Sequence, residues 1–235
     1  MTEKIEARKA EHIRLASEEA VESPGSSEGA FDSVELVYQA LPEINRDDVD
    51  TSVRFLGKTL KLPFLIGSMT GGTEEAHQIN LRLAEAAAYC GVGMCLGSQR
   101  IMLENPASTY SFEIRNMAPD ILLISNIGAV QLNLGVGAEQ IRRLIDEVGA
   151  DAVVLHLNAA QEAIQEGGDT QFAGLMDSLA HAIPNIGVPC GIKEVGGGFS
   201  SHAAGKLAGL PLSFVESAGR GGTSWTLLEG LRAEN

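Results

Sequence analysis

From Pro63 onward the chain alternates short apolar runs with stretches of helical character, and this rhythm constrains the fold more than any other feature. Strands that alternate with helices at this spacing predict a parallel α/β sheet. Right-handed crossovers, with polar groups where each strand ends, favour a (β/α) barrel over an open sheet. The predicted strands lie in PFLIGS at 63–68, VGMCLG at 92–97, ILLISNIG at 121–128, AVVLHLN at 152–158, VPCGIKEV at 188–195 and LSFVES at 212–217.

We predict helices between these strands and divide the chain into residues 1–62 and 63–235. The second part supplies the first six units of the barrel; a closed barrel has eight, so the last two βα units are absent from this chain. The first part is an extension with a helix-prone start (1–20), a loop (22–29) and a hairpin around Gly57 that covers the N-terminal end of the barrel. The predicted helices lie near 74–89, over part of 103–117, near 138–148, 170–182 and 201–208, and in a last stretch that ends at 235.

The charge balance limits the classes of partner. The chain carries 17 basic and 31 acidic side chains, a net charge of −14. We therefore expect no binding to nucleic acid or to an anionic membrane, because both need a basic field. A small anionic ligand needs only a few local Arg and Lys residues. Three cysteines in apolar contexts, a charged start and the lack of a membrane-length apolar run predict a soluble cytoplasmic protein.

The stretch DAVVLHLNAAQE at 151–162 places several polar side chains directly after an apolar strand. The period of a strand puts His156 and Asn158 on one face, and Gln161 and Glu162 follow. (β/α) barrels keep their reacting groups at the C-terminal ends of their strands. The alternative is that His156 and Asn158 only cap the strand by bonding neighbouring backbone groups.

Two earlier strand ends carry further candidates. The small residues of 67–72 would let a flat or anionic ligand approach the backbone, or would simply form a tight turn. Ser98, Gln99 and Arg100 offer a hydroxyl, an amide and a guanidinium after the second strand. The guanidinium of Arg100 could bind a phosphate, although a surface ion pair is the ordinary role of a single Arg.

The later strand ends and the start of the chain add four more groups. Asn126 is a ligand contact or an ordinary strand-end Asn. Lys193 lies in a strand that should be buried, so its partner is a ligand or an acid on another strand. The turn at 219–223 could receive an anion, or Thr223 could be an N-cap. The cluster Arg8, Lys9 and His12 would ordinarily be solvated charge.

The chain resembles type 2 isopentenyl diphosphate isomerases over nearly its whole length. Six motifs occur in the order found in that family, and FDSVELVYQALPEIN at 31–45 is also similar to it. Each motif is weak alone, but six in register are specific. They are RKAEH at 8–12, SMTGG at 68–72, GSQR at 97–100, HLNAAQE at 156–162, IKEVG at 192–196 and GRGGTSW at 219–225.

The resemblance implies a TIM (β/α)8 barrel of the FMN-linked type, assembled as a homo-oligomer. It implies an isomerase of isoprenoid biosynthesis that interconverts isopentenyl and dimethylallyl diphosphate with reduced FMN and Mg²⁺, the flavin being kept reduced by NADPH or another donor. Its flavin-binding positions are Ser68, Met69, Thr70, Ser98, Asn126, Lys193 and Thr223. Its substrate-binding positions are Arg8, Lys9, Ser98, Gln99, Arg100, His156, Asn158 and Gln161. The catalytic positions are His156, Gln161 and Lys193, and the Mg²⁺ position is Glu162.

The chain departs from the family in two respects. Glu216 stands where the family usually has Asp, and nothing after Trp225 resembles the two glycine-rich loops that bind the FMN phosphate. Two other functions stay open on the sequence. A related FMN-dependent oxidoreductase for a 2-hydroxy acid or dihydroorotate-like substrate would share the buried Lys and the glycine loops, but would not explain RKAEH or HLNAAQE. A truncated, inactive subunit would pair its open sheet edges with another chain.

Overall fold

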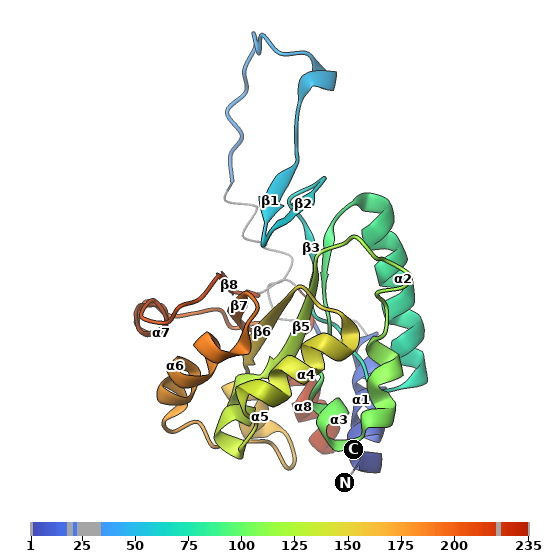
Figure 1. Cartoon of the computed structure of the whole chain (residues 1–235), viewed down its shortest axis with the longest axis vertical. Coiled ribbons are helices and arrows are strands. Elements are labelled where there is room, and N and C mark those ends of the chain that lie inside the picture. Colours follow the sequence, from blue (N-terminus) through green and yellow to red (C-terminus); the bar gives the residue numbers. More distant parts are fainter. Residues whose placement is uncertain (1, 18–20, 23–33, 220–221, 235) are drawn as a thin grey trace.

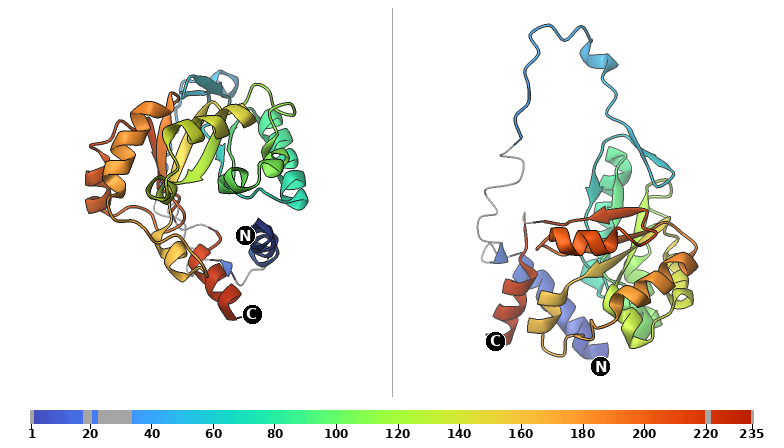
Figure 2. Two further views of the ribbon diagram at one scale, coloured as in Figure 1. Left: turned by 60° about the horizontal axis from the view of Figure 1, so that its bottom comes forward. Right: turned by 90° about the vertical axis from the view of Figure 1, so that its left-hand side faces the viewer.

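The computed structural model describes residues 2–17, 21–22, 34–219 and 222–234. A parallel sheet of six strands, in the sequential order β3-β4-β5-β6-β7-β8, forms its centre. The sheet curls, and helices follow its strands (Figures 1 and 2). All six predicted strands and the barrel class are confirmed. The strands are β3 (Leu65–Ile66), β4 (Gly93–Cys95), β5 (Leu123–Gly128), β6 (Ala152–Leu157), β7 (Cys190–Glu194) and β8 (Phe214–Glu216).

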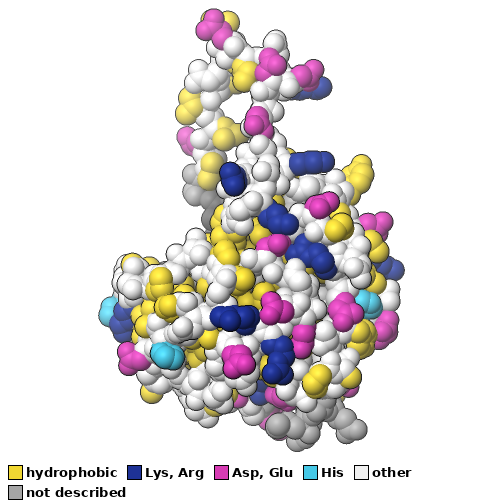
Figure 3. All heavy atoms as spheres, viewed as in Figure 1, with side chains coloured by type: hydrophobic (Ala, Val, Ile, Leu, Met, Phe, Trp, Pro, Cys, Tyr) yellow, Lys and Arg dark blue, Asp and Glu magenta, His cyan; other side chains and the backbone are white. Residues whose placement is uncertain are grey.

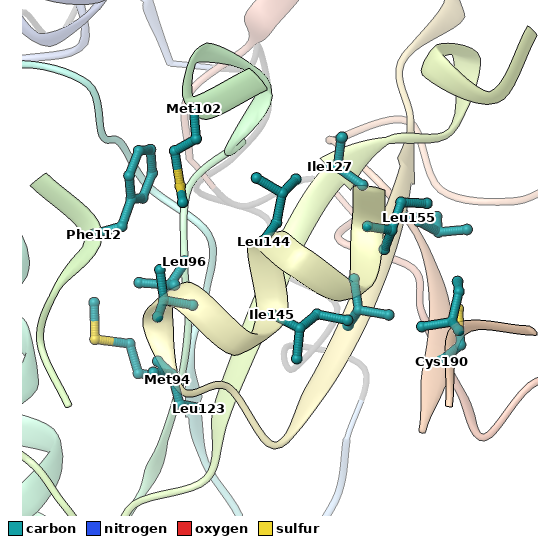
Figure 4. Packing of buried hydrophobic residues seen from close by; sticks show 14 of the residues in the cluster. Met94, Leu96, Met102, Phe112, Leu123, Ile127, Leu144, Ile145, Leu155 and Cys190 are labelled. Atoms are coloured by element: carbon teal, nitrogen blue, oxygen red, sulfur yellow. The ribbon is translucent and has the colours of Figure 1, made fainter. Parts of the chain in front are cut away.

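The longer helices pack against the outer face of the sheet. Each carries an apolar stripe, and these stripes meet the strand residues that point outward. Figure 4 shows Leu144 and Ile145 of one helix lying over Ile127 and Leu155 of the strands. The helices are α2 (Glu74–Cys90), α4 (Ala138–Val148), α6 (Leu175–Ile186) and α7 (Ser201–Leu207).

A predicted hairpin closes one end of the sheet. Strands β1 (Val53–Phe55) and β2 (Lys58–Leu60) pair antiparallel around the turn at Gly57. Leu60 packs on the inward residues at the starts of the central strands, and the ring of Phe55 lies 5.7 Å from that of Phe214. The hairpin thus covers the N-terminal ends of the strands, which leaves the C-terminal ends as the open side.

Two helices from distant parts of the chain meet at that open side. Helix α1 (Thr2–Ala16) packs against α8 (Trp225–Glu234), with Leu15, Val21 and Leu228 as the buried core of the contact. An ion pair between Arg232 and Glu11 joins them. Figure 1 places both helices at the end opposite the hairpin. The predicted loop at 22–29 lies, apart from Glu22, outside the described residues.

The segment 34–52 extends away from the barrel as an arm that includes a 3₁₀ turn, η3 (Arg46–Asp48). It carries apolar side chains that contact little of the body: Leu36, Val37 and Tyr38 are 90%, 82% and 86% exposed. The arm stands clear at the top of Figure 3. It therefore adds little to the core that positions the strand ends.

The helices differ from prediction in three places. The helix expected within 103–117 is instead a short helix α3 (Arg100–Glu104) followed by the 3₁₀ helix η4 (Pro106–Phe112). Proline disfavours helical backbone in the preceding residue, and Asn105 is extended, so α3 stops at Glu104. A six-residue helix, α5 (Ala159–Ile164), directly follows β6 and was not predicted.

Helix α6 begins later than the predicted 170–182. Gly174 has φ +75°, a left-handed conformation that separates the preceding loop from the helix. The loop before it, residues 165–174, folds back over α5, where the backbone N–H of Asp169 donates to Glu162.

Candidate functional site

Four neighbouring strands project polar side chains toward the inside of the curled sheet at its open end. The register aligns His156 of β6 with Lys193 of β7, and Lys193 with Glu216 of β8. Asn126 of β5 is the next polar group on the same face and lies within hydrogen-bonding distance of His156. The residues singled out at four separate strand ends therefore form one continuous row.

The imidazole of His156 is held in one orientation by Asn126. The Nδ2 group of Asn126 donates to the carbonyl of Leu96 at 3.0 Å, which turns its Oδ1 toward His156 Nδ1 at 2.8 Å. Nδ1 of His156 is therefore the donor, and Nε2 is left as an acceptor beside Gly128. Burial, followed by the charges of Lys193 and Lys9, lowers the pKa of His156 to about 3, so the ring is neutral at physiological pH.

This pKa makes a prediction about stability. Because the unfolded chain binds a proton at His156 below about pH 6.5 and the folded chain does so only near pH 3, folding free energy is lost as the pH falls between these values. The limiting slope is about 1.4 kcal/mol per pH unit. Urea unfolding at several pH values should show this slope, and His156→Asn should remove it. The matched change at exposed His202 should leave the slope unchanged; equal slopes in wild type and His156→Asn would contradict the assignment.

Lys193 is 5% exposed. Its Nζ donates to the backbone carbonyl of Glu194 at 2.7 Å and lies 3.5 Å from the Glu216 carboxylate. The acid on another strand, one of the two partners that the sequence predicted, is thus Glu216, and glutamate in place of the family's aspartate still reaches the lysine. The ammonium keeps further donor capacity toward the inside of the sheet.

A second polar group follows β6. Nδ2 of Asn158 donates to Oε1 of Gln161 at 3.1 Å and to Oε1 of Glu162 at 2.9 Å. Glu162 is 8% exposed, and its Oε2 accepts from Gln165 and from the backbone N–H of Asp169. The short helix α5 thereby holds one buried carboxylate in a fixed rotamer.

Helix α1 adds basic side chains to this end of the sheet. Nζ of Lys9 donates to the carbonyl of Ser98 at 3.2 Å and lies 5.6 Å from the centre of the Phe112 ring. Burial, followed by the charge of Arg8, lowers the pKa of Lys9 to about 7. Burial and nearby Arg100 also lower the pKa of Arg8, although Glu229 and Glu162 oppose this. The cluster is therefore part of the site and not only solvated charge.

Arg100 and Gln99 differ in their exposure and therefore in their availability to a ligand. Arg100 pairs with Glu104 and with Asp169 and stays partly exposed. Gln99 is fully buried: Ser125 and the backbone N–H of Asn126 donate to its Oε1, and its Nε2 faces the interior. Arg100 is thus available to a ligand, whereas Gln99 supports the strand that carries Asn126.

The loop after β3 provides backbone and small side chains. Ser68 Oγ is buried without a hydrogen-bond partner among the described residues, Met69 is half-exposed, and the Thr70 backbone lies so close to Gly97 that a Cβ there would overlap it. Thr223 precedes α8 and forms an antiparallel bridge with Glu22; residues 220–221 of its turn lie outside the described residues.

Glu229 was not singled out from the sequence. It is 1% exposed on α8, contacts His12 at 2.9 Å, pairs with Arg232 and accepts from Gln161 at 3.4 Å. Burial raises the pKa of Glu229, but the hydrogen bond and charge of His12, and then those of Arg232, bring it below its ordinary value. The sequence offered one signal for Glu229, its position three residues before Arg232 in the last helix. That spacing does not show that α1 is the helix that packs against it.

The residues present fit both groups that the resemblance implies. The oxygens of Glu162, Asn158 and Gln161 are the hard donors that Mg²⁺ prefers, and Mg²⁺ usually takes only one or two protein carboxylates. No group of three His, Cys, Asp or Glu able to hold a metal occurs among the described residues. The partnerless Ser68 hydroxyl and the Lys193 ammonium are suited to the polar edge of a flavin.

Comparison with known proteins decides the family. A family model described as FMN-dependent dehydrogenase matches residues 2–111. A protein of Oceanobacillus iheyensis named isopentenyl-diphosphate delta-isomerase is 45% identical over 235 residues, which is 100% of this chain and 67% of that protein. The chain belongs to the isopentenyl-diphosphate delta-isomerase family. The match to FMN-dependent dehydrogenases supports the FMN-dependent type of this isomerase.

Other isopentenyl-diphosphate delta-isomerases agree. The Synechococcus protein is 46% identical over 96% of this chain, and the Nostoc protein 46% over 98%. The chain spans 65% of the length of each of these two proteins. An old yellow enzyme homologue from Zymomonas mobilis is 15% identical with a TM-score of 0.45, covering 71% of this chain and 73% of that one. Within the described residues, no helix is both long and apolar enough to cross a membrane.

Proposed function

We propose that the site interconverts isopentenyl and dimethylallyl diphosphate, using reduced FMN and Mg²⁺. The observation that carries this proposal is the link that Asp169 makes between Arg100 and the buried carboxylate of Glu162: its carboxylate accepts from Arg100, and its backbone N–H donates to Glu162. Basic side chains beside a buried carboxylate suit a ligand that carries negative charge together with a cation. A diphosphate with its Mg²⁺ supplies the negative charge for the arginines and the cation for the carboxylate.

Each side chain has a distinct task in this proposal. Arg8, Lys9 and Arg100 bind the diphosphate oxygens, and Glu162 holds the Mg²⁺ with Asn158 beside it. Neutral His156 offers an acceptor at Nε2 and no net charge, and Gln161 connects the substrate end of the site to Glu229. Ser68, Met69, Thr70, Ser98, Asn126, Lys193 and Thr223 would line the flavin.

Isomerisation adds a proton at one carbon of an unactivated alkene and removes one nearby. When bound, reduced FMN would supply the proton-transfer chemistry, and the ammonium of Lys193 would favour negative charge on the flavin. The partners Glu194 and Glu216 keep this ammonium in place. The curled sheet buries two members of the inward row of side chains, Asn126 and Lys193, which are 3% and 5% exposed.

The low pKa of Lys9 predicts that diphosphate binding weakens as the pH rises above about 7. A bound anion favours the ammonium form, so binding takes up a proton at a pH where Lys9 is partly neutral. Calorimetry of magnesium pyrophosphate binding between about pH 6 and pH 9, in two buffers of different ionisation enthalpy, measures this uptake.

Lys9→Gln should remove that part of the uptake, while Lys61→Gln, at an exposed position, should retain it. The difference between the two variants cancels the ionisation of pyrophosphate itself. Identical uptake in both variants would contradict the role of Lys9.

The proposed function is tested by an anaerobic flavin titration of the purified chain with dithionite, Mg²⁺ and isopentenyl diphosphate. We expect FMN binding and the formation of dimethylallyl diphosphate. Binding that appears only after a C-terminal segment with two glycine-rich phosphate loops is added would assign the activity to a longer protein. No binding in either form would overturn the isomerase function. NADPH as reductant, homo-oligomeric assembly and a cytoplasmic location remain predictions from the sequence.

A further inference from the structure

Asp169, in the loop between α5 and α6, contacts both halves of the proposed diphosphate site. Its carboxylate accepts from Nη1 of Arg100 and, at 2.7 Å, from Nε2 of Gln131. Its backbone N–H donates to Oε2 of Glu162 at 2.7 Å. One residue therefore connects the guanidinium proposed to bind phosphate with the carboxylate proposed to hold Mg²⁺.

The guanidinium of Arg100 is oriented by two acids. Glu104 accepts from its Nε at 3.2 Å and Asp169 from its Nη1. Among the described residues, no hydrogen bond involves its Nη2. The two acids hold the plane of the guanidinium and leave one donor edge for an incoming oxygen, which is the arrangement that favours directed binding of an oxyanion.

The carboxylate of Glu162 is oriented from the same loop. Asn158 donates to its Oε1, while Gln165 and the Asp169 N–H donate to its Oε2. Each oxygen of a carboxylate can accept more than one bond, so Oε1 keeps capacity for a cation. Hydrogen bonds to a ligating carboxylate fix its direction, and their loss typically lowers metal affinity about 10- to 100-fold.

The loop approaches α5 more closely than a side chain would allow. A Cβ added at Gly168 would overlap the backbone carbonyl oxygen of Glu162. Gly168 thus permits the Asp169 N–H to reach Oε2, and any larger residue there must push the loop away from Glu162.

We propose that Asp169 is the positioning residue that sets the spacing between the diphosphate-binding Arg100 and the Mg²⁺-holding Glu162. The proposal rests on the proposed function and extends it to a residue outside the motifs. Asp169 touches neither substrate nor metal in this role; it acts through Arg100, Gln131 and Glu162. Its signature is a change in how strongly Mg²⁺ improves the binding of a diphosphate.

The test is calorimetry of inorganic pyrophosphate binding to the full chain, with and without Mg²⁺. The variants are Asp169→Ala, which removes the carboxylate, and Gly168→Ala, which displaces the loop but leaves Asp169 in place. Asp169→Asn keeps the shape and one acceptor oxygen. Asp177→Asn, at an exposed position on α6, is the control for the loss of one negative charge.

We expect Asp169→Ala and Gly168→Ala to lose roughly 10-fold or more of the affinity for magnesium pyrophosphate, with Asp169→Asn in between and Asp177→Asn within about twofold of wild type. Without Mg²⁺, Asp169→Ala should bind pyrophosphate at least as well as wild type, because Arg100 has lost an acidic competitor. A merely structural role would weaken binding equally with and without Mg²⁺ and would lower the melting temperature.

The outcomes separate the two proposals. If the wild-type chain shows no improvement of pyrophosphate binding by Mg²⁺, the proposed function is overturned, and the role of Asp169 with it. If wild type shows the improvement and Asp169→Ala retains it, or loses affinity equally under both conditions, only the role of Asp169 is overturned.

Discussion

Glu162→Gln is expected to abolish most of the improvement that Mg²⁺ gives to pyrophosphate binding, a loss of roughly 100-fold in the Mg²⁺-dependent part of the affinity. The substitution removes the one buried carboxylate of the proposed metal position. It also places an NH₂ group where Asn158, Gln165 or the Asp169 N–H now donates, so donor faces donor. Calorimetry with and without Mg²⁺ measures the effect.

The matched control is Glu166→Gln, an exposed glutamate just beyond α5 with the same change of charge. It should keep the Mg²⁺-dependent gain within about twofold of wild type. A Glu162→Gln protein that keeps the gain within about threefold would show that another group holds the cation, and the metal position would have to be sought elsewhere on the open side of the sheet.

Phe112→Ala is expected to cost about 3–5 kcal/mol of unfolding free energy, the range for removing a fully buried aromatic side chain. The ring is fully buried, lies against the Gly71 backbone so closely that a Cβ there would overlap it, and packs in the main core with Ile101 and Met94. In a close-packed core, relaxation of the neighbours fills such a cavity only in part.

Urea unfolding measures this cost, and Phe64→Ala is the control because that ring is 63% exposed. The control should change the unfolding free energy by less than about 1 kcal/mol. The Phe112 variant should also lose magnesium pyrophosphate affinity, because its ring supports the ammonium of Lys9. A loss of stability below about 1 kcal/mol would mean that the region repacks or is loosely ordered.

The strands could be predicted from the sequence because short apolar runs recur between stretches of helical character, and the central runs are too apolar for half-exposed strands. The run at 121–128 is buried over the whole of β5, as expected of a parallel strand covered on both faces. Short helices were harder: α5 has only six residues and no apolar period of its own, and it is held in place by contact with α8. Propensity decides little over so few residues.

The candidate site divides in the same way. His156, Asn126 and Lys193 could be placed because strand alternation sends them to one face, and the parallel register brings their strand ends together. The burial of Gln99 depends on its hydrogen bonds with Ser125 and Asn126 of β5, which no local pattern reveals. Asp169 and Glu229 act through partners in other elements, and those pairings exist only once the tertiary structure has formed.

The meeting of α1 and α8 has a consequence for the order in which the protein assembles. The Arg232–Glu11 contact joins residues 221 positions apart, whereas the strands of the sheet pair with their neighbours in sequence. Closing so long a loop is entropically unfavourable until much of the intervening chain is already compact. The barrel strands can therefore pair before Arg8, Lys9 and Glu229 arrive at their ends. Local opening of this helix pair would remove Arg8 and Lys9 from the proposed anion-binding site, while the hydrophobic core around the sheet stayed intact.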